Sequence, residues 1–425
     1  MLKTVYPICC GVDVHKKFFV ATLITTEELT PRYQKRRFST FNNQILEFRQ
    51  WLLENNCRDV CMESTGKYWI PVYNLLEDAI HVTVANPKWV KAIKGNKDDV
   101  KDSKWIGDLF RIGLVPGSFI PPKDIRFLRE FTRYRSKLVA CKTGEKNRYQ
   151  NVFTVCNVAL DAVVSDMFGV SASSVTDYLV NSDTFDPEHC VSLLKHSIRK
   201  NKSAAVIESI EGFQMSDAQK QRARMVKEHY DFLLRQIQRI DEAIDTLAKP
   251  FESAIALLCT APGFDRRSAI AVISEIGTDM DEFGSSKRLC RWAGLTPGNN
   301  ESAGKKHSVH IIRAGVYIKP MLVQMAWAAT KSINSPYYAV KYAAISKRRG
   351  KKRAVIAIAR MMLTAVFHML STGEVWNPSD LQQVDMPPEL REKQLQHDLR
   401  RAANLLVANG VVAPDAIQIP DHITG

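Results

Sequence analysis

The 425-residue sequence lacks the features of a membrane protein or of a disulfide-stabilised secreted protein. No apolar run approaches the roughly 20 residues that a membrane-spanning helix needs, and the first residues, MLKTVYPICC, do not have the layout of a signal peptide. The nine cysteines form neither a CxxC pair nor a Cys/His array with zinc spacing. We therefore expect no membrane partner, a cytoplasmic location, and reduced thiols that are mostly buried.

Negative charge is also scarce relative to positive charge. The chain has 59 Lys and Arg residues against 45 Asp and Glu residues, a net charge of +14, while its 45% apolar content is ordinary for a globular protein. An excess of this size favours a polyanionic partner. Since the membrane option is weak, we expect that partner to be nucleic acid. The length predicts two or three domains.

The stretch Ile8–Ile24, ICCGVDVHKKFFVATLI, predicts a strand, a tight polar turn and a second strand. Asp13 stands where a buried strand would normally carry Val or Ile. A buried carboxylate requires a cation or a set of hydrogen-bond donors. The alternative is an acid that caps the hairpin turn, and this stretch alone does not decide between the two.

Strands and helices then alternate up to residue 112. We expect further strands at residues 36–41, 59–63 and 81–85, and helices at residues 45–55, 68–79 and 98–112. Asn42 or Asn43 is the expected cap of the first helix. The pattern predicts an α/β domain with a sheet of mixed strand direction over residues 1–122.

Residues 123–250 are helical, highly charged and almost free of proline, which predicts an arm or an assembly element. Apolar side chains there alternate steps of four and three: Val226, Tyr230, Leu233, Ile237, Ile240, Ile244 and Leu247. This heptad spacing is typical of a coiled coil. It also fits the core helix of a bundle, and both alternatives stay open.

The remaining sequence predicts a mostly helical domain over residues 251–375 and a proline-punctuated tail over residues 376–425 with one helix. Residues 257–277 have a Pro-Gly turn between two apolar segments and resemble a helix–hairpin–helix, whose turn amides can hold a DNA phosphate. Residues 293–308 read as a loop. The basic run Ser346–Arg353 could contact phosphates or simply form a solvated surface.

Three further acids could lie near Asp13. Glu63 ends a strand that could neighbour the first one, and Asp99 and Asp102 are spaced to share one helix face. Four carboxylates would repel one another unless divalent cations were bound, and oxygen ligands suit Mg²⁺. Two such ions about 4 Å apart could assist phosphoryl transfer. The alternative is a turn acid together with acids that favour a helix N-terminus.

Several motifs occur in a fixed order: GVDVHK, MESTGKYW, NPKWVKAIKGNKDDVKDSKWIGDLFRIGL, APGFDRRSAIAVISEIG and AGLTPGNNESAGKK. Together they resemble the DEDD transposases of insertion sequences related to the Piv DNA invertase, a group of bridge-RNA-guided recombinases. The resemblance covers about residues 5–120 and 255–330. It implies an RNase H/RuvC-like N-terminal domain in which Asp13, Glu63, Asp99 and Asp102 bind Mg²⁺, with Mn²⁺ as an alternative. Asp98 replaces the family's usual Thr, so which of Asp98 and Asp99 faces the metal stays open.

The resemblance also implies a serine nucleophile. The family's loop after a GL-x-P motif matches Gly294–Pro297 followed by residues 301–304, which places Ser302 at the second serine of the family pair and Glu301 at the first. The expected activity is site-specific recombination of an insertion sequence through a covalent phosphoserine. The expected partners are donor and target double-stranded DNA, a structured guide RNA, and further copies of the chain in a dimer to a tetramer, in the prokaryotic nucleoid.

Two other functions fit the same residues in part. A Holliday-junction-type endonuclease would use the acids with water as the nucleophile and would not need Ser302. A non-catalytic DNA-binding protein would need only the basic surface and the helical arm.

Overall fold

The computed structural model describes residues 3–27, 30–64, 66–90, 99–298, 300–302, 305–308, 310–384, 386–413 and 416–417. For residues 99–101, 300–302 and 305–308 it describes the backbone alone. The chain divides into two compact units, Met1–Ile120 and Pro121–Gly425. The first unit contains a β-sheet, and the second is mostly helical.

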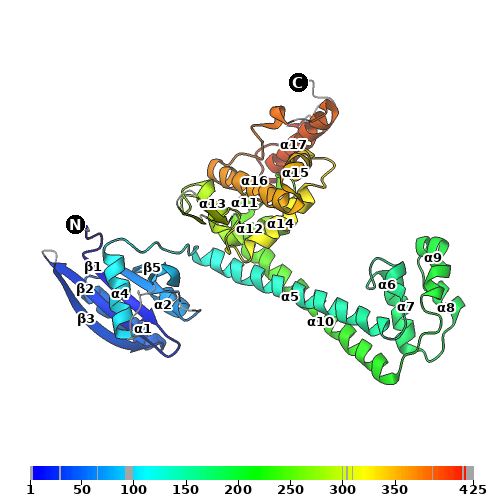
Figure 1. Ribbon diagram of the computed structural model, residues 1–425, viewed down its shortest axis with the longest axis horizontal. Helices are drawn as coiled ribbons and strands as arrows, with labels where there is room; N and C mark the ends of the chain where they lie inside the picture. Colours follow the sequence, from blue (N-terminus) through cyan, green and yellow to red (C-terminus); the bar gives the residue numbers. More distant parts are fainter. Residues whose placement is uncertain are drawn as a thin grey trace. The chain divides into compact units, whose positions relative to one another are not determined.

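The first unit is built on a five-stranded sheet (Figure 1). Its strands are β1 (Ile8–Val14), β2 (Phe18–Glu27), β3 (Thr30–Ser39), β4 (Asp59–Glu63) and β5 (His81–Ala85). They lie in the order β3-β2-β1-β4-β5. The pairs β1·β2 and β2·β3 are antiparallel, whereas the pairs β1·β4 and β4·β5 are parallel. The expected hairpin and the mixed sheet are confirmed.

Helices cover both faces of this sheet. One face carries α1 (Asn42–Glu54) and α2 (Trp69–Leu76), and α4 (Asp99–Arg111) packs on the other, after the short α3 (Pro87–Val90). Alternation along β1 sends Cys10, Val12 and Val14 toward α1 and α2, while Cys9 faces α4. Because both faces are covered, β1 is almost continuously apolar, and Asp13 is its one acid.

Two details of the predicted elements were wrong. The third strand begins at Thr30, six residues before the expected start, because it continues along β2 down to the pair Glu27 and Thr30. The first helix is not capped by an asparagine side chain. Its N-cap is Phe41, which has extended backbone and makes no side-chain capping bond.

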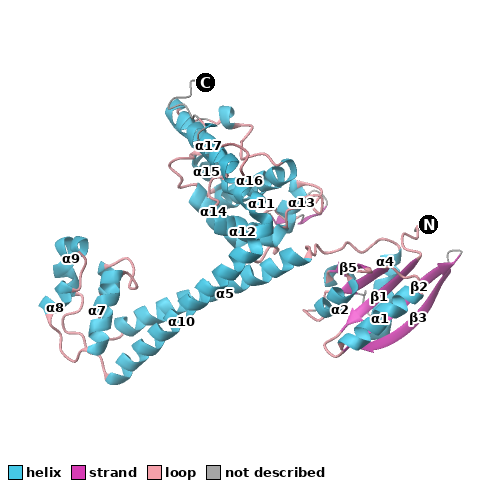
Figure 2. Ribbon diagram, turned by 180° about the vertical axis from the view of Figure 1, so that it is seen from behind, coloured by secondary structure: helices cyan, strands magenta, loops and turns pink. Residues whose placement is uncertain are grey.

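The second unit begins with a long helical arm. Helix α5 (Lys123–Thr154) packs along α10 (Asp217–Ala248) in the opposite direction. Between them the chain forms four short helices at the far end of the pair (Figure 2): α6 (Leu160–Val163), α7 (Val170–Asn181), α8 (Pro187–Ser192) and α9 (His196–Glu208). Five residues of the predicted heptad are buried: Tyr230, Leu233, Ile237, Ile240 and Ile244. The helix that α10 packs along belongs to the same chain.

A helical domain follows the arm. Its elements are η1 (Lys249–Phe251), α11 (Glu252–Cys259), α12 (Arg266–Ile276), α13 (Ser286–Trp292), β6 (Asn300–Ser302), β7 (Lys305–Ser308), α14 (Ile318–Ala329), α15 (Tyr337–Arg349), α16 (Lys351–Thr372), η2 (Leu381–Gln383) and α17 (Pro388–Ala408). Helix α16 packs against α11, α13, α14 and α15 and forms the centre of this domain.

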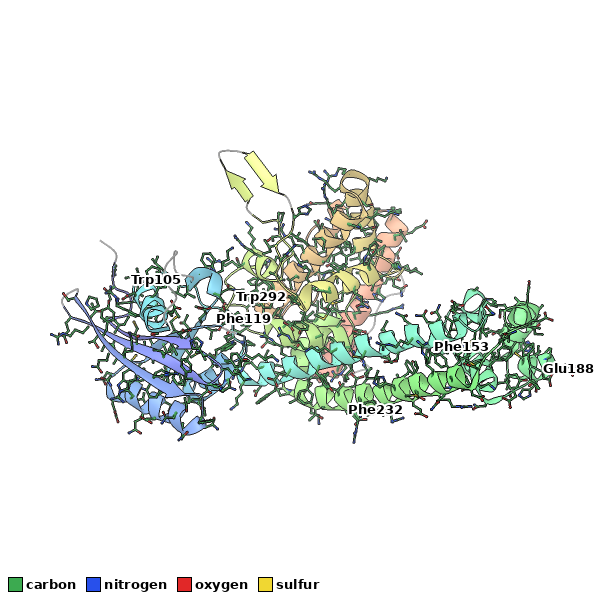
Figure 3. All side chains as sticks on the ribbon, turned by 60° about the horizontal axis from the view of Figure 1, so that its bottom comes forward. Trp105, Phe119, Phe153, Glu188, Phe232 and Trp292 are labelled. Atoms are coloured by element: carbon green, nitrogen blue, oxygen red, sulfur yellow. The ribbon has the colours of Figure 1, made fainter. Side chains whose placement is uncertain are left out.

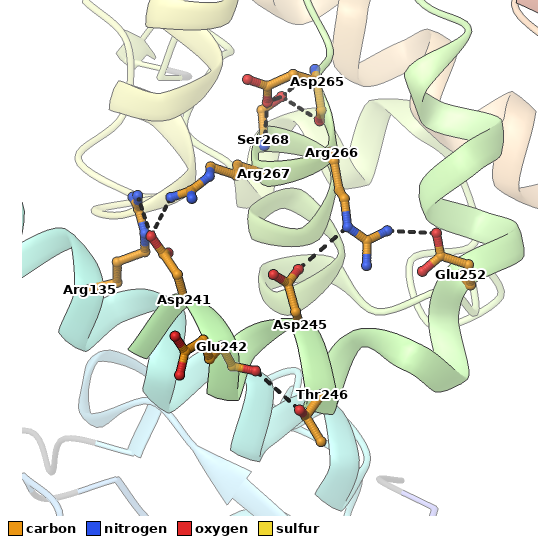
Figure 4. A network of polar contacts seen from close by, with 10 residues as sticks. All are labelled: Arg135, Asp241, Glu242, Asp245, Thr246, Glu252, Asp265, Arg266, Arg267 and Ser268. Carbon is orange, nitrogen blue, oxygen red and sulfur yellow. Dashed lines mark hydrogen bonds and ion pairs between the residues drawn. The ribbon is translucent and has the colours of Figure 1, made fainter. Parts of the chain in front are cut away.

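Ion pairs join the arm to this domain (Figure 4). Asp241 of α10 accepts hydrogen bonds from Arg135 of α5 and from Arg267 of α12. At the other end of α12, Arg129 donates to the carbonyl oxygens of Ser274 and Glu275 at 2.9 and 2.7 Å. These carbonyls belong to the last turn of α12, which lacks partners within the helix, so the guanidinium satisfies them.

Helix α16 is long and apolar enough to cross a membrane by length and composition. No such helix was expected, because the sequence has no apolar run that approaches roughly 20 residues. Nearly half of its most apolar window, 44%, is buried inside the protein. The core helix of a helical bundle can be equally long and apolar. Helix α16 packs against four neighbouring helices, as such a core helix does.

Candidate active site

Asp13 lies in β1, the middle strand of the five-stranded sheet. It is the penultimate residue of β1 and only 7% of its surface is exposed. Its Oδ2 lies 3.0 Å from Nε2 of His15, the first residue of the turn between β1 and β2. The turn is closed by a bond from the His15 amide to the Phe18 carbonyl oxygen at 2.9 Å. Asp13 is therefore a buried strand residue rather than an exposed turn cap.

Glu63 lies beside Asp13 in the sheet. Val12 pairs with Met62 across the parallel strands β1 and β4, so the next residues, Asp13 and Glu63, stand at the same level. Cys61, two residues before Glu63, packs on the α4 face, and alternation places Glu63 on that face as well. The predicted neighbourhood of these two strand ends is confirmed by the register.

The third element of the acidic site is α4, which runs antiparallel to β1. Its last residue accepts hydrogen bonds at its carbonyl oxygen from the amides of Val5 and Tyr6, before β1 begins. A Cβ atom added to Gly11 would lie 2.2 Å from the carbonyl oxygen of Ser103, near the other end of α4. The first turn of α4 therefore lies toward the end of β1 that carries Asp13. That turn contains Asp102, which is half-buried.

Asp99 is the first residue of α4, and the structure describes its backbone only. Asp98 lies outside the described residues, so the choice between the two stays open. Among the side chains that the structure does describe, no three His, Cys, Asp or Glu residues are grouped closely enough to hold a metal ion. The four-acid metal site thus remains a prediction. The donors fit a hard cation, because carboxylate oxygens are what Mg²⁺ binds.

The second predicted site is on a hairpin rather than on the expected loop. Ser302 is the last residue of β6 and pairs with Lys305 of β7, whereas Asn300 pairs with Ser308. Ser302 therefore lies at the tip end of the hairpin, and only its backbone is described. The two strands, yellow-green in Figure 3, stand out from the helices of their domain. The stretch was expected to be a loop because it is rich in Gly, Asn and Ser. It forms a hairpin instead, and part of the strand pairing involves a residue outside the stretch, Ile311.

That pairing continues at the base of the hairpin. Pro297 bridges to Ile311, and the Gly298 amide donates to the carbonyl oxygen of His310 at 3.0 Å. Below it, a Cβ atom at Gly315 would lie 2.1 Å from the carbonyl oxygen of Ala293. Gly315 also has φ of +64°, which favours glycine. Hence the backbone segments before and after the hairpin are in direct contact.

Two protein-family models match the chain. The DEDD transposase model of the IS110 group, described as a transposase, matches residues 10–157. The transposase IS116/IS110/IS902 family matches residues 255–343. Together the two segments span more than half of the sequence. The chain is an IS110-family transposase. No curated protein matches it.

The transposase moves an insertion sequence, acts on DNA by phosphoryl transfer, and belongs to a group whose DEDD domain uses a divalent metal. The first matched segment holds the whole described acidic site, and the second holds the Ser302 hairpin. An enzyme of this type is not the non-catalytic binding protein that the basic surface alone would allow. The five-stranded mixed sheet, with a mostly helical remainder, is consistent with an RNase H-like DEDD transposase.

The Pro-Gly turn of the transposase does join two helices, α11 and α12, as the sequence predicts. A Cβ atom at Gly263 would lie 2.8 Å from the carbonyl oxygen of Met325 in α14, so the turn packs against the domain itself. The N-terminus of α12 is capped by the carboxylate of Asp265. Because a carboxylate already occupies this position, the turn is poorly suited to hold a phosphate.

Sequence reasoning missed two features of the acidic site. One is His15, which reads as a turn residue but contacts Asp13. The other is the contact of Gly11 with Gly107, where α4 approaches the sheet so closely that neither position has room for a larger side chain. A glycine inside a strand is a known signal of close backbone approach, and this signal was present at Gly11.

All nine cysteines of the transposase are free and seven are buried, as the sequence predicts. Burial raises the pKa of Cys61 to about 12 and the pKa of Cys259 to about 11. Both thiols stay protonated at neutral pH, which makes them poor nucleophiles.

Proposed function

We propose that this transposase is a site-specific recombinase that cuts and rejoins DNA through Ser302, with divalent metal ions held by Asp13, Glu63, Asp99 and Asp102. The observation that carries the proposal is the register of β1 and β4, which sets Asp13 beside Glu63 on the face where the first turn of α4 begins. Carboxylates from two strand ends and one helix end thus face the same side of the sheet, and a bound cation would draw them together, since the described side chains alone are not grouped closely enough to hold it.

The acids supply binding and position. Asp13 is held by its strand and by His15, so its carboxylate needs no reordering before it binds a cation. Bound divalent ions would supply Lewis-acid stabilisation of charge on the phosphate and on the oxygen that leaves it. The buried setting of Asp13 strengthens its attraction to a cation, because interactions between charges are less screened there.

Ser302 supplies the nucleophile. Its Oγ forms a bond to phosphorus while the bond from phosphorus to one sugar oxygen breaks. The serine proton passes to water or to a base, and the departing oxygen takes up a proton as an alcohol. The phosphodiester energy is kept in the phosphoserine, so the reverse reaction with a new strand rejoins DNA without an external energy source.

The proposal includes a structured guide RNA and an assembly of two to four copies of the chain. The net charge of +14 supports a nucleic-acid partner of either kind. Base pairing by an RNA would supply target sequence, while the protein binds backbone and shape. Digestion of the purified complex with ribonuclease should abolish cutting at a specific site. Unchanged site-specific cutting after digestion would remove the guide RNA from the proposal.

The decisive experiment is a denaturing gel of end-labelled DNA with wild-type, Ser302→Ala and Ser308→Ala protein. Wild type should give protein-linked DNA, and Ser302→Ala should lose both this adduct and the recombinant product while it still binds nucleic acid. Ser308→Ala is the matched control, because it removes a hydroxyl from the same hairpin and should keep the adduct. A Holliday-junction-type endonuclease would instead form no adduct and would continue to cut without Ser302.

A further inference from the structure

The helical domain contains a large groove that the proposed chemistry leaves unused. Its volume is about 1390 Å³, and it lies along α15, α16 and the segment from Thr372 to Asp380. One end is lined by Leu295, Pro297, His310 and Ile311, which are the residues flanking the Ser302 hairpin. A cavity of this size exceeds the roughly 300–1,000 Å³ of small-molecule sites, so it fits a segment of a polymer.

Positive charge lines this groove. Arg349, Lys352, Arg353 and Arg360 are exposed, and none of them forms an ion pair with a carboxylate in the described part of the chain. Two acids also line it, Glu374 and Asp380. Asp380 is already neutralised, because it binds the Lys341 ammonium and accepts a hydrogen bond from the Tyr337 hydroxyl at 2.6 Å. These partners hold the pKa of Asp380 below its ordinary value, although its partial burial opposes them.

The floor of the groove is apolar. Ile356, Ala357, Met361 and Ala365 line it, and each is half-buried rather than covered. They share one face of α16 at helical spacing, while Ile358, Met362 and Val366 on the other side are packed into the domain. Proteins that hold unpaired nucleic acid combine cations that contact phosphates with side chains, most often aromatic, that contact the bases. Here the floor is aliphatic, so it offers the bases an apolar contact surface between the cations of the rim.

We propose that this groove holds an unpaired stretch of the DNA strand next to the phosphate that Ser302 attacks. The inference rests on the proposed function, because the hairpin whose base lines the groove is the one that carries Ser302. Pro297 lines the groove and is only five residues before Ser302, so a strand that leaves the groove reaches the hairpin directly. A DNA duplex would present no bases to the apolar floor.

A second copy of the chain fits the groove less well. An apolar helix from another protomer could cover the floor, but it would take the four cations out of water with no partner. A strand of DNA places one phosphate per nucleotide along the same rim. Charge complementarity therefore favours DNA as the occupant.

The basic run offers a charge-matched test, because only some of its cations line the groove. Arg353→Gln with Arg360→Gln removes two cations that line it, and Lys347→Gln with Arg348→Gln removes two that do not. A third variant, Ala357→Leu with Ala365→Leu, fills the floor without a change of charge. Thermal unfolding verifies that each variant is folded. Binding is measured by fluorescence anisotropy across a salt series with oligo(dT) of about 12 nucleotides, oligo(U) of equal length and a duplex.

We expect the Arg353/Arg360 variant to bind oligo(dT) about tenfold more weakly and to lower the salt slope by roughly 1.4, about 0.7 for each phosphate that the protein no longer neutralises. The Lys347/Arg348 control should change both values by less than half as much. The filled-floor variant should bind oligo(dT) at least about fivefold more weakly, as expected when one base no longer stacks on the floor, and should bind the duplex as wild type does.

Three results would overturn the inference. Equal reductions of affinity in the two charge variants would show a diffuse surface, and tighter binding of oligo(U) with groove-dependent reductions for RNA alone would make RNA the occupant. A fall in mass by light scattering for the filled-floor variant, with oligo(dT) binding unchanged, would make a second copy the occupant. None of these measurements needs catalysis, so the absence of a Ser302 adduct would reject the proposed function without deciding the groove.

Discussion

The sheet domain and the helical domain hold their reactive residues in opposite ways. Asp13 lies in the middle strand of a sheet covered on both faces, whereas Ser302 ends a strand of three residues on a hairpin. The acid is fixed by the same packing that makes the fold. Among the described residues, the hairpin of the serine is joined to its domain at the base, where Pro297 bridges to Ile311.

This difference suits the roles proposed for the two groups. Carboxylates that bind a cation repel one another until it arrives, and a rigid sheet keeps them on the same side. A nucleophile that attacks phosphorus must approach and then carry a covalently attached strand. Residues at loops and hairpin tips tolerate such movement better than residues in a core. Substitutions in the sheet domain and substitutions at the Ser302 hairpin should therefore have separate effects, and each can be used to test the contrast.

The largest effect is expected at Asp13. Asp13→Asn removes a charge that would bind a cation, and cleavage should fall by roughly 10²–10⁴-fold, the rate equivalent of several kcal/mol of lost charge stabilisation. Asp102→Asn should behave in the same way, with folding and DNA binding retained. Asp108→Asn, on the exposed side of α4 where the carboxylate binds Lys104, is the control. Unchanged cleavage in Mg²⁺ by both site variants would refute the acidic site.

The second prediction compares two glycines in equivalent situations. An added methyl group at Gly11 would lie 2.2 Å from a carbonyl oxygen of α4, and one at Gly315 would lie 2.1 Å from a carbonyl oxygen beside the hairpin base. Gly11→Ala should push α4 off the sheet and destabilise the first unit by about 3 kcal/mol, at the upper end of overpacking effects. Gly315→Ala should displace the hairpin base and reduce the Ser302 adduct.

Thermal unfolding and adduct yield measure both glycine variants. If the comparison is right, Gly11→Ala lowers the unfolding temperature of the sheet domain, and Gly315→Ala lowers adduct yield more than it lowers stability. The reverse pattern would mean that the hairpin base is part of the rigid core and that the contrast between the two sites is mistaken.

The third prediction concerns the arm, whose apolar seam packs against α5 of the same chain. Ile237 is 8% exposed in this seam, and Ile237→Asn should loosen the arm by about 3 kcal/mol, because it removes buried apolar surface and adds an amide. Limited proteolysis should then cut within the arm, while the mass by light scattering stays unchanged. Leu234→Asn is the matched control on the exposed side, where Leu234 is 39% exposed.

A lower mass for Ile237→Asn with no new cleavage would show that the seam joins different chains. A lower mass for Leu234→Asn would instead assign assembly to the outer face of α10. The opposite flank of α10 carries a second exposed apolar residue, Phe232, which is labelled in Figure 3 and is 46% exposed.

Sequence reasoning worked best where burial and periodicity act together. The run of apolar residues in β1 predicted a buried strand, and its single acid, Asp13, is buried in that strand rather than exposed as a turn cap. It failed at β6 and β7, whose pairing depends on Pro297 meeting Ile311 across the hairpin. No local pattern encodes such a contact. The heptad of α10 was visible in the sequence, but its partner helix was not. An apolar seam has the same sequence pattern whether the helix that packs on it belongs to the same chain or to another.

The smallest effect is expected at Asp398, a half-buried aspartate that is not part of the proposed acidic site or of the Ser302 hairpin. Asp398 of α17 accepts a hydrogen bond from Gln394 at 3.0 Å, but its Oδ1 is buried without a partner among the described residues. Burial raises its pKa to about 6, although Gln394 and Arg401 lower it in part. This carboxylate opposes folding when it is charged.

The folded protein therefore binds the Asp398 proton more tightly than the unfolded chain, whose aspartate has an ordinary pKa near 3.8. The stabilisation is complete below pH 4 and is lost as pH rises through about 6. Asp398→Asn keeps an acceptor for Gln394 and removes the charge. Its free energy of unfolding should equal that of wild type at pH 4 and exceed it by roughly 1–3 kcal/mol at pH 7.5. Adduct formation should be unaltered. Equal stability of the two proteins at both pH values would show that Asp398 is hydrated in the folded state, and a lost adduct would make it part of the serine site after all.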